Sequence, residues 1–348
     1  MRTLGAVTAI IPTYQRPQML RRALSSVLRQ TIPNVRVCVY DNASGGETES
    51  VVKAFASGDA RVQYFRHDRN IGAMANFLFG MRRVETPYFS FLSDDDVLLP
   101  DFYETALSGF ARQPDALMSA ASTVEVDEAG RPLFEPLALW PREGIFEPPS
   151  GAFAMLDNRH PTWTTVLFRR EAIDRIGYLD LDVGAPSDLD FELHLAACAP
   201  IVVSKRVCGA YVRHADAHSV GETAEVATGF ARICRKIDED TQIETDTRKK
   251  LAARVLRQLR MKLVEVWVKG LVRGDDAVAR DAALAMRDRY GPRLGGSLLL
   301  GGWRAIIAAA PLRALLRIVE NTRLGRRAAA ARSIEPARLR QIRETLAL

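Results

Sequence analysis

The sequence predicts an α/β protein with a mostly parallel sheet flanked by helices, followed by a C-terminal helical region. Short apolar segments alternate four times with helix-like segments in the first 100 residues. This alternation is typical of a parallel sheet with helices on its faces. From about residue 221 onward the pattern is helical. We therefore expect a first domain over residues 1–220 and a basic helical region over residues 221–348.

The first expected strand is the apolar segment AVTAII at 6–11. A helix is expected at 17–30, because Pro17 suits the first turn of a helix and an apolar stripe follows it. The further elements expected in this part of the chain are strands at 35–40, 61–66 and 88–92, and helices at 47–57 and from Gly72 through about Arg83. Frequent Pro and Gly between 130 and 151 indicate an irregular region.

Composition excludes several classes of protein. Apolar residues make up 47% of the 348 residues and charged residues 26%, which are ordinary values for a globular chain. The four cysteines form no CxxC pair, which argues against a disulfide-stapled module and a cysteine-ligated zinc site. We expect four buried thiols. The first apolar run is too short for a signal peptide, and the stretch 297–316 contains two arginines and a proline, so it is a poor membrane span.

Charge is distributed unevenly along the chain. Residues 251–348 carry a net charge of +12, whereas residues 1–250 carry −6. The basic part has three interpretations: packing on the first domain or on a second copy of the chain, contact with an anionic membrane surface, or nucleic-acid binding. Nucleic acid is disfavoured because few aromatic residues interleave with the basic ones. We expect a cytoplasmic protein, either free or peripheral on the inner face of the cytoplasmic membrane.

Three consecutive acids, Asp94, Asp95 and Asp96, directly follow the fourth expected strand. Adjacent like charges repel and raise one another's pKa. A bound Mg²⁺ or Mn²⁺ removes this cost, and both ions prefer oxygen ligands and often share phosphate oxygens. Ligands of parallel sheets bind beyond the carboxyl ends of the strands, where this cluster lies. The alternative is a solvated acidic loop that caps the next helix.

Three further polar residues have a functional and a structural interpretation. Asp41 ends the second strand, where it either forms a turn or accepts the N3–H of a pyrimidine base. Asp188 is expected in the first turn of a helix, whose dipole keeps a carboxylate ionised. It either caps that helix or acts in catalysis, with Asp190 as its competitor. His214 is either structural or an imidazole ligand, which suits Mn²⁺ better than Mg²⁺.

Five motifs, in this order, resemble those of the family 2 inverting nucleotide-sugar glycosyltransferases, which have the GT-A fold with its Rossmann-like sheet. The motifs are PTYQRPQMLRRALSSVLRQ, YDNAS, DRNIG, FLSDDD and PSDLD. The resemblance covers roughly residues 5–220. Three positions depart from the family pattern: Ser187 stands where Glu is usual before the catalytic base, Ser93 where Asp is common in the metal motif, and Gln15 where Asn is frequent after Tyr14.

The resemblance implies a role for each matching residue. Asp188 would be the catalytic base, Asp96 would bind the metal directly, and His214 would join the metal or the diphosphate. Asp41 would hold the base of the nucleotide. The residues implied in nucleotide-sugar binding are Pro12, Thr13, Tyr14, Asp41, Asn70, Gly72, Asp94 and Asp95.

The implied activity is a metal-dependent, inverting sugar transfer in bacterial polysaccharide or glycoconjugate synthesis. The donor would be a UDP-sugar ahead of a dTDP-sugar, the cofactor Mn²⁺ or Mg²⁺, and the acceptor a saccharide, a lipid-linked molecule or a protein. Two alternatives stay open: a nucleotidyltransferase of similar fold, and a non-catalytic nucleotide-sugar-binding scaffold. The first is disfavoured because residues 12–17 lack glycine, and the second because the acidic motifs are intact. A dehydrogenase would need GxGxxG after a strand, which this chain lacks.

Overall fold

The computed structural model describes residues 6–214, 223–290, 297, 299 and 334–347. Its contacts divide the chain into two compact units. The first unit consists of residues 1–181, 191–216 and 330–348, and the second of residues 182–190 and 217–329. The change of unit after residue 216 lies close to the domain boundary expected at 220, but the chain also passes between the units at 182, 191 and 330. The domain limits expected from the sequence stay a prediction.

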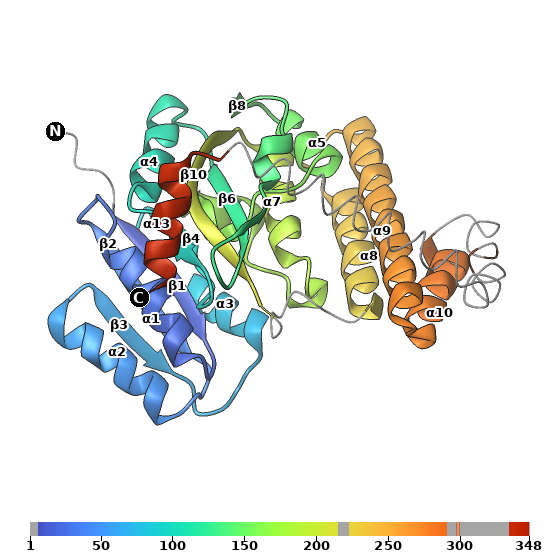
Figure 1. Ribbon diagram of the computed structural model, residues 1–348. Coiled ribbons are helices and arrows are strands. Elements are labelled where there is room, and N and C mark those ends of the chain that lie inside the picture. The colour runs from blue at the N-terminus through green and yellow to red at the C-terminus, as the bar shows by residue number, and fades with distance from the viewer. Residues whose placement is uncertain (1–5, 215–222, 291–296, 298, 300–333, 348) are drawn as a thin grey trace. The chain divides into compact units, whose positions relative to one another are not determined.

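The first unit is built on a mixed sheet in the order β3-β2-β1-β4-β9-β6-β10-β5, with β7 paired to β6 and β8 to β10 (Figure 1). Strands β1, β2, β3 and β4 are parallel, as are β6 and β10, whereas β9 is antiparallel to both its neighbours. The strands are β1 (Val7–Thr13), β2 (Val35–Asp41), β3 (Val62–Arg66), β4 (Tyr88–Phe91), β5 (Val97–Leu98), β6 (Met118–Asp127), β7 (Pro132–Phe134), β8 (Gly144–Phe146), β9 (Val166–Arg169) and β10 (Ile201–Arg213). The mostly parallel α/β sheet predicted from the sequence is confirmed.

Helices connect the parallel strands as the sequence predicts. The helices of this unit are α1 (Pro17–Leu28), α2 (Gly46–Gly58), α3 (Ala73–Met81), α4 (Phe102–Arg112), α5 (Ser150–Asp157), α6 (Glu171–Ile176) and α13 (Pro336–Leu346), with 3-10 turns η1 (Pro136–Leu139), η2 (Trp163–Thr165) and η3 (Leu181–Val183), the last of which crosses into the second unit. Helix α7 (Ser187–Cys198) begins in the second unit and continues into the first. Its start at Ser187 is where the sequence places it.

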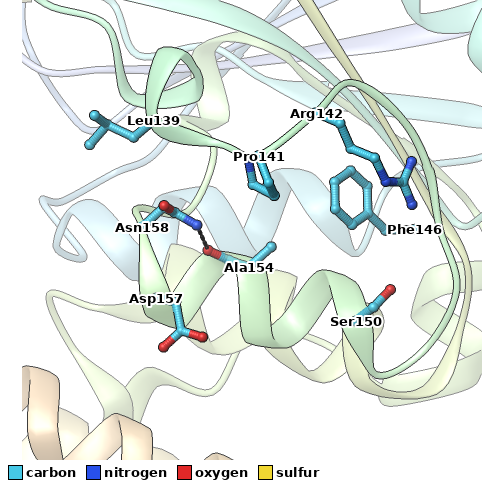
Figure 2. Close-up of a pocket in the computed structure, with 8 residues that line it drawn as sticks. All are labelled: Leu139, Pro141, Arg142, Phe146, Ser150, Ala154, Asp157 and Asn158. Atoms are coloured by element: carbon cyan, nitrogen blue, oxygen red, sulfur yellow. Dashed lines mark hydrogen bonds between the residues drawn. The ribbon is translucent and has the colours of Figure 1, made fainter.

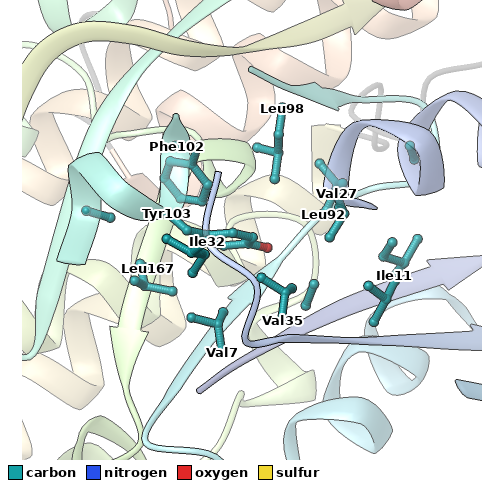
Figure 3. Close-up of a cluster of buried hydrophobic side chains, with 14 of the residues drawn as sticks. Val7, Ile11, Val27, Ile32, Val35, Leu92, Leu98, Phe102, Tyr103 and Leu167 are labelled. Carbon is teal, nitrogen blue, oxygen red and sulfur yellow. The ribbon is translucent and has the colours of Figure 1, made fainter. Parts of the chain in front are cut away.

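Alternate residues of the central strands face opposite sides of the sheet. Ile11 of β1 belongs to the core cluster that also contains Val27 of α1 (Figure 3). On the other face, Ile10 and Tyr40 lie against α3, where Gly80 makes the close approach possible. A Cβ at position 80 would lie 2.5 Å from Ile10 Cγ2 and 2.7 Å from Tyr40 Cε2.

The segment expected to be irregular, 130–151, contains β7, η1 and β8. Both strands are only three residues long, too short for an alternating pattern to appear in the sequence. The four cysteines are free. Three of them are buried, as expected, but Cys198 is only half-buried.

Helix α13 returns from the end of the chain and packs against α1, β5 and β10 (Figure 1). Ile342 is buried in a cluster with Leu99 and Val212. Arg338 donates from its two terminal nitrogens to the two carboxylate oxygens of Asp101, both at 2.6 Å. An apolar contact and a bidentate ion pair therefore hold this helix to the sheet.

The second unit is helical. It contains α8 (Thr223–Glu239), α9 (Thr245–Arg273), α10 (Asp276–Ala285) and a π-helical turn at Met286–Tyr290. Leu263 and Trp267 of α9 are buried with Ala282 of α10 in one cluster. Within the described residues, every helix is too short or too polar to cross a bilayer. The stretch 297–316 belongs to the basic region for which the sequence offers a membrane-surface interpretation. It lies outside the described residues apart from 297 and 299.

Replacing Ile342 by Ala tests how much α13 contributes to the first unit. Ile342 is fully buried, so we expect Ile342→Ala to lower the free energy of unfolding of this unit by about 2 to 4 kcal/mol. Arg340→Ala, at an exposed position of the same helix, should change it by less than about 0.5 kcal/mol. Chemical denaturation measures both, and equal losses in the two variants would contradict the packing described.

Candidate functional site

The polar residues at the ends of β1 and β2 lie side by side. Thr13 is paired with Asp41 across the two parallel strands. The end of β4 lies on the other side of β1, where Ile10 is paired with Phe91. The Thr13 hydroxyl donates a hydrogen bond of 2.8 Å to Asp94 Oδ2 in the loop after β4. The structure thus brings three of the sequence-predicted residues to one edge of the sheet.

Asp94 is almost fully buried, with 5% of its surface exposed. Burial and the neighbouring charge of Asp95 raise the pKa of the Asp94 carboxyl to about 6. The hydrogen bond from Thr13 and the charge of Arg16 act in the opposite direction. The ionised form of the Asp94 carboxyl is therefore destabilised at this position, and Thr13 and Arg16 only partly offset the effect.

Asp95 joins three parts of the first unit. Its Oδ2 lies 2.9 Å from His214 Nε2, just after β10, and accepts a 2.9 Å hydrogen bond from Arg16 Nη1, just before α1. The same Arg16 nitrogen lies 3.4 Å from Asp94 Oδ1. The His214 side chain is 2% exposed, and its Nδ1 has no hydrogen-bond partner among the described residues.

Asp96 lies deeper than Asp95 and is held by neutral donors. The Thr164 hydroxyl in η2 donates to its Oδ2 at 2.5 Å, and the Val212 N–H in β10 donates to its Oδ1 at 3.1 Å. Complete burial, together with the charge of Asp95, raises the pKa of the Asp96 carboxyl well above its ordinary value. These contacts tie the acidic loop to η2 and β10. Metal binding by Asp96 stays a prediction.

Asp41 is fully buried at the end of β2. The Ser44 N–H donates to its Oδ1 at 2.9 Å, and the Tyr64 hydroxyl donates to its Oδ2 at 2.6 Å. Burial and these contacts with the carboxylate raise the pKa of Tyr64, which keeps its hydroxyl protonated as a donor. The observed contacts give Asp41 a turn-forming role, while each carboxylate oxygen retains a further lone pair.

Two loops at this edge have unusual backbone conformations. Gln15 and Ala43 have φ of +54° and +64°, a region that side chains other than glycine rarely adopt. The Gln15 N–H donates to Ser44 Oγ at 2.8 Å, which joins the two loops. Pro12 is buried in β1, whereas Tyr14 is 41% exposed. Of the predicted residues in this motif, Tyr14 presents the most surface to a ligand.

Asn42 fixes the loop before α3. Its Nδ2 donates to Asn70 Oδ1 at 2.8 Å, and its Oδ1 accepts the Ile71 N–H at 2.8 Å. The Gly72 N–H also donates to Asn70 Oδ1, and Gly72 has φ of +90°. Asn70 and Gly72 are therefore attached to the end of β2, on the same edge as Asp41.

Asp188 belongs to the second unit, which the structure describes separately from the first. It lies half-exposed in the first turn of α7. Its competitor Asp190 is buried and forms an ion pair with Lys236 of α8. Of the two carboxylates, Asp188 is the more accessible.

The residues of the acidic cluster fit a divalent cation that takes only some of its ligands from the protein and the others from a substrate and water. No group of three His, Cys, Asp or Glu side chains surrounds a common point in the described part of the chain. Mg²⁺ and Mn²⁺ commonly bind through one or two carboxylates together with waters and substrate phosphates. A carboxylate and an imidazole already in contact, as Asp95 and His214 are, form a donor set that suits Mn²⁺.

The sequence interpretation did not single out several residues that shape this site. Arg16 and Asn42 lie inside the motifs PTYQRP and YDNAS, each within two residues of a predicted one, and this proximity was an available signal. Thr164 and Tyr64 had no such signal, since only the folded chain brings them to Asp96 and Asp41.

A cavity of about 450 Å³ lies elsewhere in the first unit, between η1, β8 and α5 (Figure 2). The residues that line it are Leu139, Pro141, Arg142, Phe146, Ser150, Ala154, Asp157 and Asn158. Phe146 pairs with Ile201 at the beginning of β10, the opposite end of that strand from His214. The cavity contains none of the predicted site residues.

Comparisons with known proteins identify the family of the sheet region. The profile of glycosyl transferase family 2 matches residues 8–177. An uncharacterized glycosyltransferase of Rickettsia felis is 37% identical over 100 residues, which are 28% of this chain and 16% of the relative. The chain thus spans less than a fifth of the length of the first curated relatives that it matches.

Two solved structures share the fold. The S. aureus TarS fragment 1-349 in complex with UDP-GlcNAc is 16% identical, with a TM-score of 0.62 over 94% of this chain and 91% of that one. The mannosyltransferase PcManGT from Pyrobaculum calidifontis, in complex with GDP-Man and Mn²⁺, is 18% identical, with a TM-score of 0.54 over 94% and 86%. The family profile spans the strand ends and the acidic cluster, and these neighbours share the sheet around them, so residues 8–177 belong to glycosyl transferase family 2 and have the GT-A fold.

Proposed function

We propose that the chain is a metal-dependent, inverting glycosyltransferase that moves a sugar from a nucleoside-diphosphate sugar to a hydroxyl acceptor. The observation that carries the proposal is the acidic cluster after β4, where Thr13 and His214 from two other strands converge on Asp94 and Asp95. Solved neighbours that hold UDP-GlcNAc, or GDP-Man with Mn²⁺, support this class of donor.

We assign the cation to Asp95 and His214. Asp95 is the most exposed of the three acids, and its Oδ2 already meets the imidazole. The sequence predicts Asp96 as the direct ligand, but Asp96 accepts hydrogen bonds on both oxygens, from Thr164 and the Val212 N–H, so we propose that it anchors the loop instead. When bound, the cation supplies electrostatic stabilisation for the charge that develops on the departing nucleoside diphosphate.

The nucleotide would lie along the ends of β1 and β2. Tyr14 is partly exposed after β1, and the loop of Asn70 and Gly72 is hydrogen-bonded to Asn42 at the end of β2. Asp41 would accept the N3–H of a pyrimidine through a remaining lone pair. Uracil and thymine both offer that donor, so UDP-sugars and dTDP-sugars are both candidates, and the UDP-GlcNAc neighbour favours UDP.

Asp188 would act as the general base. It would take the proton from the acceptor hydroxyl as that oxygen attacks the anomeric carbon from the face opposite the diphosphate. It lies in the first turn of α7, at the positive end of the helix dipole, and is more accessible than Asp190. The acceptor would be a saccharide, a lipid-linked molecule or a protein. A role in polysaccharide synthesis at the cytoplasmic face of the membrane stays a prediction, as does association into homo-oligomers.

A panel of sugar donors tests the proposal directly. We expect release of nucleoside diphosphate from UDP-sugars in the presence of Mn²⁺, and a fall of at least about 100-fold in EDTA because the leaving diphosphate loses its counter-charge. Adding excess Mn²⁺ should restore the rate. Turnover that persists in EDTA would refute the metal assignment, and a preference for GDP-mannose would refute the pyrimidine assignment of Asp41.

Asp188→Asn tests the base. Because a general base contributes about 10² to 10⁴-fold, we expect donor cleavage, with water or an added saccharide as acceptor, to slow by that factor. Affinity for UDP with Mn²⁺, measured by calorimetry, should not change. Asp182→Asn, at an exposed position of the same segment, is the matched control. If Asp190→Asn abolished cleavage while Asp188→Asn retained it, the two roles would have to be exchanged.

A further inference from the structure

Arg16 contacts two of the three acids in the acidic cluster. Its Nη1 lies 2.9 Å from Asp95 Oδ2 and 3.4 Å from Asp94 Oδ1. The two carboxylate side chains are largely buried, with 12% and 7% exposed, whereas 26% of the Arg16 side chain is exposed. The guanidinium therefore contacts two of the three acids and is itself more exposed than either of them.

The backbone of Arg16 is anchored at both ends. The preceding Gln15 has φ of +54° and is bonded through its N–H to Ser44 of the neighbouring loop. The Arg16 carbonyl accepts the Leu20 N–H at 2.9 Å in the first turn of α1. These backbone bonds are separate from the contacts that the long Arg16 side chain makes with the acids.

The guanidinium and a divalent cation would compete for the same oxygen. Asp95 Oδ2 already meets two nitrogens at 2.9 Å, those of Arg16 and His214. A cation that binds this oxygen with His214 would lie a few ångströms from the positive charge of Arg16. At such a distance like charges repel strongly, since the pair is only partly exposed to screening solvent.

We propose that Arg16 is an internal counter-ion of the unloaded site, which compensates Asp94 and Asp95 until a divalent cation binds Asp95 and displaces it. The inference rests on the proposed function, because it takes the cation position at Asp95 and His214 from there. Competition from Arg16 keeps the affinity for the cation low when no sugar donor is bound. The diphosphate of the donor raises that affinity by adding its own oxygen ligands. Arg16 thereby couples cation binding to donor binding.

The test is calorimetric titration of the metal-free, full-length chain with Mn²⁺ in the absence of nucleotide. We expect Arg16→Gln to bind Mn²⁺ about tenfold more tightly than the wild type, because one competing positive charge is removed. Arg16→Lys should stay near the wild-type value, since a single nitrogen makes both contacts. Arg29→Gln removes the same charge from the far end of α1 and should have no effect.

Two further measurements separate this role from a merely structural one. In EDTA, Arg16→Gln should melt at a lower temperature than the wild type, and saturating Mn²⁺ should remove the difference. In the wild type, the side-chain Nε–H resonance of Arg16 should shift on addition of diamagnetic Mg²⁺. That signal keeps the inference testable even if Arg16→Gln does not fold, and an unchanged resonance at saturating Mg²⁺ would overturn it.

The outcomes distinguish this inference from the proposed function. If the wild type binds Mn²⁺ together with UDP, but Arg16→Gln binds Mn²⁺ alone no more tightly than the wild type, the counter-ion role is overturned and the glycosyltransferase proposal stands. If the wild type binds no Mn²⁺ even with UDP, the metal-dependent function fails, and the counter-ion role fails with it.

Discussion

The crowding of three carboxylates at the end of β4 is the constraint on which the rest of this sheet edge depends. Each carboxylate is held by a different part of the first unit: Asp94 by β1, Asp95 by the start of α1 and the end of β10, and Asp96 by η2 and β10. Hydroxyl and amide donors orient the oxygens but cancel no charge. The one arginine described in contact with the acids, Arg16, reaches Asp94 and Asp95, whereas Asp96 is held by neutral donors alone.

The first half of the fold was predictable because its signals are local. Strands β1 and β4 are short and mainly apolar, and β2 alternates between apolar and other residues until it ends at Asp41. The later strands depend on pairing across the sheet. The short β7 and β8 carry too few residues to show a pattern, and β10 is interrupted by a register shift between Val203 and Val207, around Lys205 and Arg206. These strands are specified by their neighbours and not by their own periodicity.

The candidate site divides in the same way. Strand ends in a parallel sheet meet at one edge, so grouping Thr13, Asp41 and Asp94 needed only the order of the strands. The separate roles of Asp95 and Asp96 could not be predicted in this way, because they depend on residues far along the chain. Thr164 and Val212 donate hydrogen bonds to Asp96, and His214 contacts Asp95. No local pattern distinguishes Asp95 from Asp96, because both follow the same strand.

The position of α13 in the chain has a consequence for biosynthesis. Ile342 of α13 and Ile334, just before the helix, complete an apolar cluster on β5 and β10, yet most of the second unit is encoded between Arg213 and Ile334. A ribosome therefore finishes the helical unit before it delivers the segment that covers Val97 and Leu99. Until then the nascent chain carries an uncovered apolar strip on its sheet, a natural target for a chaperone that acts during translation.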